Sequence, residues 1–288
     1  MKHIISGLSI VFCLIFLASC GGGATPIPFP EAATAIPEKD IHMILPSGLI
    51  IDAYELEGPP ETEPLTFTFV SDKSFEQILA IHEEDRKQRF ADISFIDNAY
   101  TGVMSFGMKV QFGENELVAV EKHAESDDAN PGSLTTGTVE VFLNDEVIYS
   151  TEPRDGSSVT LRGLWSDNQD WILEYAYVSK TSTKTENSAS FEFTGQLVKN
   201  GVVLNEQYSY EEAFGFQWIQ GKPFYFFKRN GQIGISIDEN ETMLGFEKIE
   251  HYGCCSAGSL NPAPAQNMVS FFAQKDSAWY YVEIGIYE

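Results

Sequence analysis

Most of this chain alternates apolar and polar residues with a period of two, and turn residues interrupt the alternation at short intervals. Residues 139–143 alternate and then meet Asn144-Asp145, and later runs end at Asn200-Gly201 and Asn230-Gly231. A period of two is the pattern of a half-buried β-strand. Asn-Gly favours hairpins because both turn residues adopt positive φ. The chain is therefore predicted to be mainly β, built of antiparallel meanders.

An echo in the sequence suggests that these meanders repeat. Four aromatic residues lie about 53 residues apart: Phe112, Trp165, Trp218 and Phe271. Each stands near the end of a short strand and is followed by a polar turn and a second apolar strand. Periods in this range are typical of repeat architectures, and four short strands are the size of one propeller blade.

The copy GLWSDNQDWILEY, over residues 163–175, resembles the strand–turn–strand of TolB-like and WD40-like β-propeller repeats. Those families place a Ser-Pro-Asp-Gly turn before an aromatic strand. This chain keeps Ser166 and an acid but lacks the Pro and Gly. The resemblance covers roughly residues 100–288 and implies a β-propeller-like fold. A β-sandwich of two meanders is the alternative.

Two segments before residue 100 complete the expected domain. Residues 74–90 carry apolar side chains at helical spacing behind a capping-box pattern, so they are predicted to form one N-terminal helix. The apolar strand from Trp279 to Ile286 needs a partner. A strand between Ile41 and Glu55 could pair with it and remove an exposed edge.

The first twenty residues carry an export signal. Lys2 and His3 precede a short apolar run, and small residues close it at Ala18 and Ser19. The run is too short for a stable membrane span and has the features of a secretory signal peptide. Leu17-Ala18-Ser19-Cys20 resembles the lipobox of bacterial lipoproteins. An ordinary signal peptide with a chance cysteine is the alternative.

The lipobox resemblance implies cleavage before Cys20 and fatty acylation, such as palmitate, on that cysteine. More than one acyl chain gives firm anchoring. Because Gly21 follows Cys20, the chain is expected in the outer membrane of a two-membrane cell, or on the outer face of the cell membrane where only one exists. The protein is thus expected to be lipid-anchored in the cell envelope and to face away from the cytoplasm.

The chain divides into three parts on this interpretation. Residues 1–19 are the signal peptide, residues 20–40 are the lipidated cysteine and a flexible Gly/Pro tether, and residues 41–288 are a single mainly-β exported domain. Three glycines and four prolines in the tether disfavour regular structure.

The charge of the chain restricts its partners. It holds 42 acidic and 18 basic residues, a formal net charge of −24. Nucleic acid is excluded, because its phosphates require Lys and Arg. Cationic partners or divalent cations fit better, although an acidic surface can serve solubility alone.

Cys254 and Cys255 are the most unusual candidates for chemistry. Exported thiols usually oxidise, and with Cys20 lipidated these two have only each other as partners in the mature chain. A disulfide between neighbours would give a rigid turn, or a redox group if it is easily reduced.

A metal site is the second interpretation of the same segment. His251, Cys254 and Cys255 offer soft ligands, but structural zinc normally takes four. No cofactor is predicted, although a divalent cation is compatible with the acidic runs 238–241 and 125–130. Both runs can equally be solvated turns.

No GxSxG, HExxH or phosphate-binding glycine loop occurs in the chain. Catalytic residues are therefore unknown, and whether the chain is an enzyme stays uncertain, with a non-catalytic protein favoured. The first functional hypothesis is a binding or scaffolding lipoprotein for an envelope protein or glycan. The alternatives are an extracytoplasmic polysaccharide hydrolase and, more weakly, a redox or metal-handling protein.

Overall fold

The structure is a computed structural model. It describes residues 40–56, 58–59, 93–96, 105–123, 137–152, 159–167, 169–185, 188–252, 261–265 and 267–286. These residues all belong to one unit, Pro37–Glu288.

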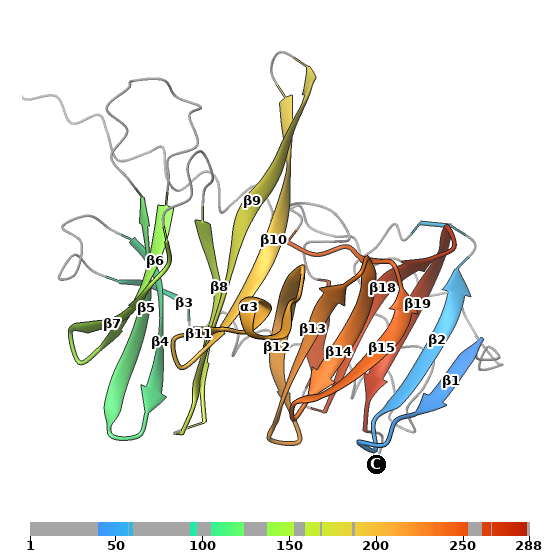
Figure 1. The fold of residues 1–288 in the computed structure, drawn as a ribbon, viewed down its shortest axis with the longest axis horizontal. Helices are drawn as coiled ribbons and strands as arrows, with labels where there is room; N and C mark the ends of the chain where they lie inside the picture. Colours follow the sequence, from blue (N-terminus) through green and yellow to red (C-terminus); the bar gives the residue numbers. More distant parts are fainter. Residues whose placement is uncertain are drawn as a thin grey trace, which may run out of the picture. The chain divides into compact units, whose positions relative to one another are not determined.

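Nearly all the described residues lie in antiparallel strands, which form four sheets (Figure 1). Sheet I contains β3 (Ile93–Ile96), β4 (Ser105–Phe112), β5 (Asn115–His123), β6 (Gly137–Leu143) and β7 (Glu146–Ser150). Sheet II contains β8 (Val159–Ser166), β9 (Trp171–Thr185), β10 (Ser188–Lys199) and β11 (Val202–Val203). Sheet III contains β12 (Glu212–Ile219), β13 (Lys222–Arg229), β14 (Gln232–Ile237) and β15 (Asn240–Phe246).

Sheet IV differs from the others because its strands come from two distant parts of the chain. It contains β1 (Ile41–Ile44), β2 (Ile50–Leu56), β16 (Lys248–Ile249), β17 (Ala263–Ala265), β18 (Met268–Lys275) and β19 (Ala278–Gly285). Strand β2 pairs with β19, from Ile50 opposite Gly285 to Leu56 opposite Trp279. The predicted pairing of these two segments is therefore confirmed.

Hairpin turns connect consecutive strands as the sequence predicts. Asn144-Asp145, Asn200-Gly201 and Asn230-Gly231 all have positive φ at both residues. The same conformation occurs at Asp238-Glu239 and Asp276-Ser277, which lack glycine. Positive φ is tolerated at such positions best by Asn, Asp and Gly.

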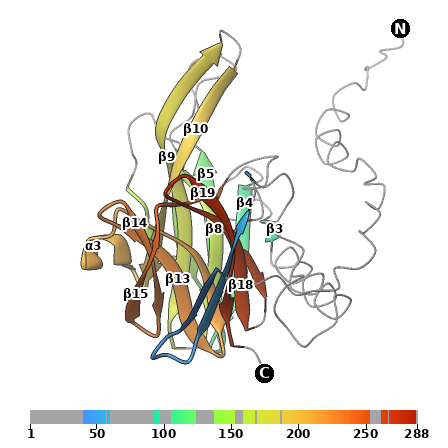
Figure 2. The same cartoon turned by 90° about the vertical axis from the view of Figure 1, so that its right-hand side faces the viewer.

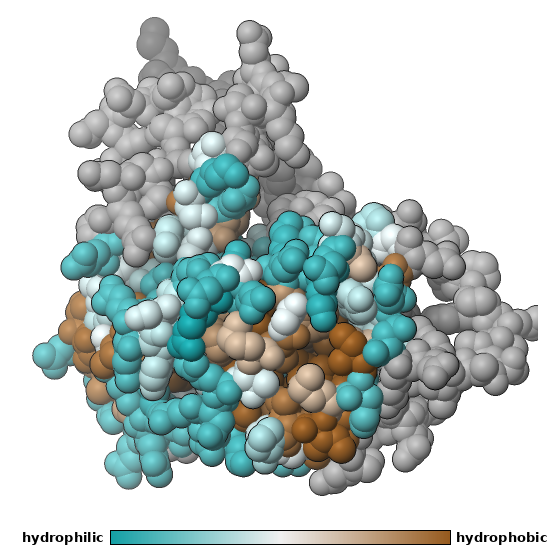
Figure 3. Space-filling view, turned by 45° about the vertical axis from the view of Figure 1, so that its right-hand side comes forward, coloured by the Kyte–Doolittle hydropathy of each residue, from teal (hydrophilic) through white to brown (hydrophobic). Residues whose placement is uncertain are grey.

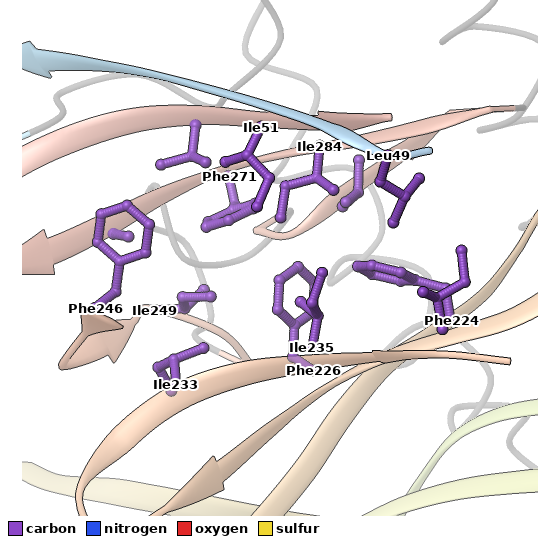
Figure 4. Packing of buried hydrophobic residues seen from close by; sticks show 14 of the residues in the cluster. Leu49, Ile51, Phe224, Phe226, Ile233, Ile235, Phe246, Ile249, Phe271 and Ile284 are labelled. Carbon is purple, nitrogen blue, oxygen red and sulfur yellow. The ribbon is translucent and has the colours of Figure 1, made fainter. Parts of the chain in front are cut away.

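Three buried clusters pack the sheets against one another in chain order. One cluster joins sheets I and II, a second joins II and III, and a third joins III and IV. In the third, Phe226 and Ile235 of sheet III face Phe271 and Ile284 of sheet IV (Figure 4). Among the described residues the sheets thus pack in series, as adjacent propeller blades do. A sandwich would have two sheets around one core.

The aromatic residues spaced by about 53 fall in equivalent strands of the four sheets, but their side chains are not equally buried. They lie in β4, β8, β12 and β18, and each strand leads by a hairpin into the next. Phe271 lies in the middle of β18 and is fully buried, whereas Trp165 and Trp218 stand near the ends of their strands and are half-buried.

Helical structure among the described residues is limited to α3 (Leu204–Tyr208). The helix predicted over residues 74–90 lies outside the described residues. The prediction of a mainly antiparallel β-fold is confirmed.

Candidate functional site

The β9–β10 hairpin is much longer than its neighbours and extends beyond them (Figure 2). Its strands are buried up to Val178 on β9 and from Gly195 on β10. Farther out the side chains become exposed, and Phe191 is 41% exposed. We call residues 179–192 the arm. Its described side chains, at residues 179–181, 191 and 192, are exposed and do not pack in the sheet.

A polar network lies where the arm joins the sheet. At its centre, the carboxylate of Glu174 on β9 accepts hydrogen bonds from the backbone N–H groups of Gly215 and Phe216, at 3.0 and 2.9 Å. The Tyr252 hydroxyl donates to the same carboxylate at 2.5 Å. Glu174 is buried, so these bonds satisfy a charge that would otherwise be costly.

Tyr252 fixes one end of the segment that carries Cys254 and Cys255. Its backbone has a φ of 57°. Burial, followed by the negative charge of Glu174, raises the pKa of its hydroxyl well above the usual value. The hydroxyl therefore remains protonated and continues to donate to Glu174.

His251 is fixed beside it. Its Nε2 lies 3.0 Å from Glu212 Oε1, and its Nδ1 lies 2.7 Å from the carbonyl oxygen of Ile249. The ring stacks on Phe214, with centroids 3.7 Å apart. Both nitrogens thus have protein partners, and binding a metal through His251 would require one of these contacts to break.

The other end of the same segment is fixed by Asn261, which is buried. Its Nδ2 donates to the carbonyl oxygens of Glu250 and Phe272, and its Oδ1 accepts from the backbone N–H of Phe272. Because Asn261 contacts Glu250 directly, the two ends of the 253–260 segment lie close together. Cys254 and Cys255 themselves, like Cys20, lie outside the described residues.

Arg162 lies between the arm and Tyr252. Its guanidinium carbon is 4.6 Å from the ring centroid of Tyr252 and 5.2 Å from that of Phe193. Both distances are within the range of cation–π attraction. Arg162 therefore joins the base of the arm to the base of the cysteine-bearing segment.

Three β-bulges place these residues. Arg162 is the extra residue where Leu161 pairs with Tyr175 and Gly163 pairs with Glu174. A second irregularity falls beside Phe193 and a third in β12 after Phe214, where Glu174 binds the backbone. Bulges redirect side chains and are common beside functional sites. Their concentration here makes this junction our candidate site.

Sequence reasoning identified His251 but missed Arg162 and Glu174. The burial of Glu174 could not be recognised from the sequence, because the residue occupies a polar position in an alternating strand, where a solvent-facing acid is expected. Arg162 gave a weak signal, since it interrupts an apolar strand in an acidic chain. A one-residue bulge cannot be located from alternation alone.

A carboxylate pair lies on the face of sheet IV away from sheet III. Asp52 and Glu283 are opposite each other across β2 and β19 and are 0% and 1% exposed. His42 Nδ1 is 2.6 Å from Asp52 Oδ1, and the Tyr281 hydroxyl donates to Glu283 Oε1 at 2.7 Å. Directly opposite side chains on one face of an antiparallel pair are neighbours, so the two acids lie side by side on this face.

The acidic run 238–241 forms the β14–β15 turn. The Glu241 carboxylate accepts hydrogen bonds from Arg229 and Tyr210, and Glu239 lies 3.6 Å from Lys199. Two of its three acids thus have cationic neighbours. The run 125–130 lies outside the described residues. Within the described part of the chain, no group of three or more His, Cys, Asp or Glu residues is placed to hold a metal ion.

Edge strands of sheets III and IV carry exposed apolar side chains. Met43 and Ile44 on edge strand β1 are exposed, as is Met243 on edge strand β15. Viewed with this side forward, the surface shows a hydrophobic area bordered by hydrophilic side chains (Figure 3). No helix in the described part of the chain has the length and apolar character to cross a membrane.

Comparisons with known proteins add little. No protein-family model matches the chain, and no curated protein matches it. Among solved structures, it is similar to the β-propeller domain of the Trilobed protease from Pyrococcus furiosus, described as having an open velcro topology. The similarity has a TM-score of 0.27 and 10% identity and covers 63% of this chain and 52% of that one. The chain spans about half of that structure.

Proposed function

We propose that this chain is an extracytoplasmic lipoprotein, anchored through lipid on Cys20, which binds or scaffolds an envelope protein or glycan. The observation that carries the proposal is the junction of the arm with the cysteine-bearing segment. At this junction the buried carboxylate of Glu174 is hydrogen-bonded to Gly215, Phe216 and Tyr252, and Arg162 contacts the rings of Phe193 and Tyr252. A rigid base lowers the entropy lost when such segments bind a partner.

Two further observations support a binding role. Met43, Ile44 and Met243 on edge strands β1 and β15 are exposed, and exposed apolar patches often mark interaction surfaces. The net charge of −24 also favours association with a cationic surface.

Shortening the arm tests the binding proposal. Replacing residues 181–191 by an Asn-Gly turn would join Lys180 to Glu192, which already pair across the hairpin. In-cell cross-linking of the full-length chain should give adducts that disappear in the shortened variant. Phe191→Ser, which keeps the arm, is the matched control for a specific aromatic contact. Equal adducts from wild type and shortened chain would refute the role of the arm.

The anchor is tested separately with Cys20→Ser. Wild type should incorporate labelled palmitate and fractionate with membranes, and the variant should do neither. An unlabelled wild-type chain, or a labelled variant, would show that Cys20 is not the lipid site.

The hydrolase alternative rests on the Asp52–Glu283 pair. Both carboxylates are almost completely buried, so a polysaccharide could reach them only after the surrounding structure moved. We therefore place this function second. If the wild-type protein released reducing ends from envelope polysaccharide, and Asp52→Asn and Glu283→Gln abolished this release, the hydrolase would become the favoured function.

The redox or metal alternative is tested by the native mass of the exported domain. A mass lower by the two thiol hydrogens, with no adduct, would establish the Cys254–Cys255 disulfide and favour a rigid loop. Intact thiols with one bound transition-metal ion would favour metal handling at His251, Cys254 and Cys255.

A further inference from the structure

Two arginines of this chain lie in the same kind of aromatic frame. The guanidinium carbon of Arg229 is 5.0 Å from the Tyr210 ring and 5.2 Å from the Phe227 ring. Arg162 lies at 4.6 and 5.2 Å from Tyr252 and Phe193. Each guanidinium thus has one tyrosine and one phenylalanine beside it.

The two frames differ in what completes them. Arg229 donates from both terminal nitrogens to Glu241, at 2.6 and 3.1 Å, so a carboxylate fills the position in front of its planar fork. For Arg162, the described residues provide no hydrogen-bond acceptor or ion-pair partner, and its Nε is buried without one. Most other described cations do have an acid beside them: Lys109, Lys122, Lys180, Lys199 and Lys248.

Two acids that act on Tyr252, the ring beside Arg162, already have partners. Glu174 accepts two backbone N–H groups and the Tyr252 hydroxyl. Glu212 Oε1 accepts the backbone N–H of Gly195 and contacts His251. Neither can turn toward Arg162 without leaving buried donors unpaired, which is costly.

We infer that Arg162 is an open carboxylate-binding site, which takes from a partner the group that Glu241 supplies to Arg229. A guanidinium held between rings is preorganised, and its fork matches a carboxylate in a bidentate geometry. The inference deepens the proposed binding function and rests on it, because the site lies at the base of the arm.

The charge of the chain selects the kind of partner. With a net charge of −24, the chain repels polyanions at long range. A polypeptide that is basic overall and presents one carboxylate is attracted as a whole and still supplies the acid for Arg162. We therefore assign a basic polypeptide with one central acidic side chain as the ligand class, in preference to an acidic glycan.

The experiment uses the exported domain and two synthetic lysine-rich peptides that differ only by a central Glu or Gln. Calorimetry should give wild type a roughly tenfold higher affinity for the Glu peptide, as one charge-assisted pair provides. The preference should vanish in Arg162→Gln and persist in the matched variant Arg229→Gln. The Arg162 side-chain NεH resonance should move on adding the Glu peptide.

Several results would overturn the inference. These are equal affinity of wild type for both peptides, no binding of either, or a preference that survives Arg162→Gln. A uronic acid disaccharide that binds through Arg162 while the peptides do not would overturn the polypeptide assignment. If the Arg162 inference fails but the arm-dependent cross-links persist, the proposed binding function still holds. If the cross-links do not depend on the arm, the binding function itself is refuted.

Discussion

Arg162 and Arg229 show how one local arrangement can serve two purposes. Both lie beside a tyrosine and a phenylalanine. Arg229 lies on β13 in a regular hairpin and reaches Glu241 on edge strand β15, two strands away, whereas Arg162 is the extra residue of a bulge. The first site is complete within the chain and stabilises sheet III. The second has aromatic neighbours but no acid partner among the described residues, so we expect its remaining hydrogen-bonding capacity to be available to another molecule.

Glu174→Ala should have the largest effect, because the Arg162 site depends on this carboxylate for its shape. The substitution leaves the N–H groups of Gly215 and Phe216 without their acceptor and the Tyr252 hydroxyl without its partner. We expect a loss of about 4 kcal/mol in the free energy of unfolding. Urea unfolding followed by tryptophan fluorescence measures it. A Glu174→Gln variant, which retains one acceptor, should lose less. Equal losses would show that the network is not what holds the site.

The second prediction compares a glycine near Arg162 with a glycine near Arg229. A Cβ at Gly195 would lie 2.5 Å from the carbonyl oxygen of Ala213 and 2.6 Å from the Tyr252 hydroxyl oxygen. A Cβ at Gly234 would lie 2.4 Å from the Phe227 ring. Gly195→Ala and Gly234→Ala should each cost about 3 kcal/mol by overpacking. Thermal unfolding of Gly58→Ala, where the Cβ meets nothing within 4 Å and φ is not positive, is the matched control without a steric clash. A change below about 1 kcal/mol at Gly195 would place Tyr252 elsewhere.

The third prediction concerns pH at the completed site. Burial alone would raise the pKa of Glu241, but hydrogen bonds from Arg229 and Tyr210 outweigh it and lower that pKa below 4.5. A lowered folded-state pKa adds stability above the unfolded value, and this contribution is lost as pH falls through the folded value. Arg229→Gln should therefore cost about 1–2 kcal/mol at pH 7, discounted for partial exposure. The cost should shrink below pH 4. A cost that is the same at both pH values would mean that the pair does not set this pKa.

The smallest effect is expected at the open site. Arg162→Gln removes contacts with Phe193 and Tyr252 but breaks no ion pair with a described residue. Without a partner it should cost less than about 1 kcal/mol, as two partly exposed cation–π contacts allow. Chemical unfolding of Arg162→Gln and Arg229→Gln side by side checks this order. A larger cost at Arg162 would indicate an internal carboxylate and remove the contrast.

The sequence predicted much of the fold because strand and turn signals are local. Asn200-Gly201 and Asn230-Gly231 are hairpin turns, and the segments that hold Trp279 and Ile50 pair as expected. At Asp276-Ser277 the sequence predicted only a polar turn after Phe271, because nothing in that pair indicates positive φ. The site was largely beyond sequence reasoning, since Arg162 meets Tyr252 through a bulge and through contacts across three sheets. Only His251 was singled out, as a possible metal ligand.

The pairing of β2 with β19 also sets the order in which the chain can mature. A polypeptide emerges from the ribosome with its N-terminal part first, so β2 exists long before its neighbour, more than two hundred residues farther on, has been made. Until then Ile51 and Ala53 lack the sheet that buries them against sheet III. Contacts this distant in sequence form slowly. A protein built in this way needs its early strands to be protected until synthesis is finished. A chain interrupted before β19 would leave β2 as an exposed, unpaired edge strand.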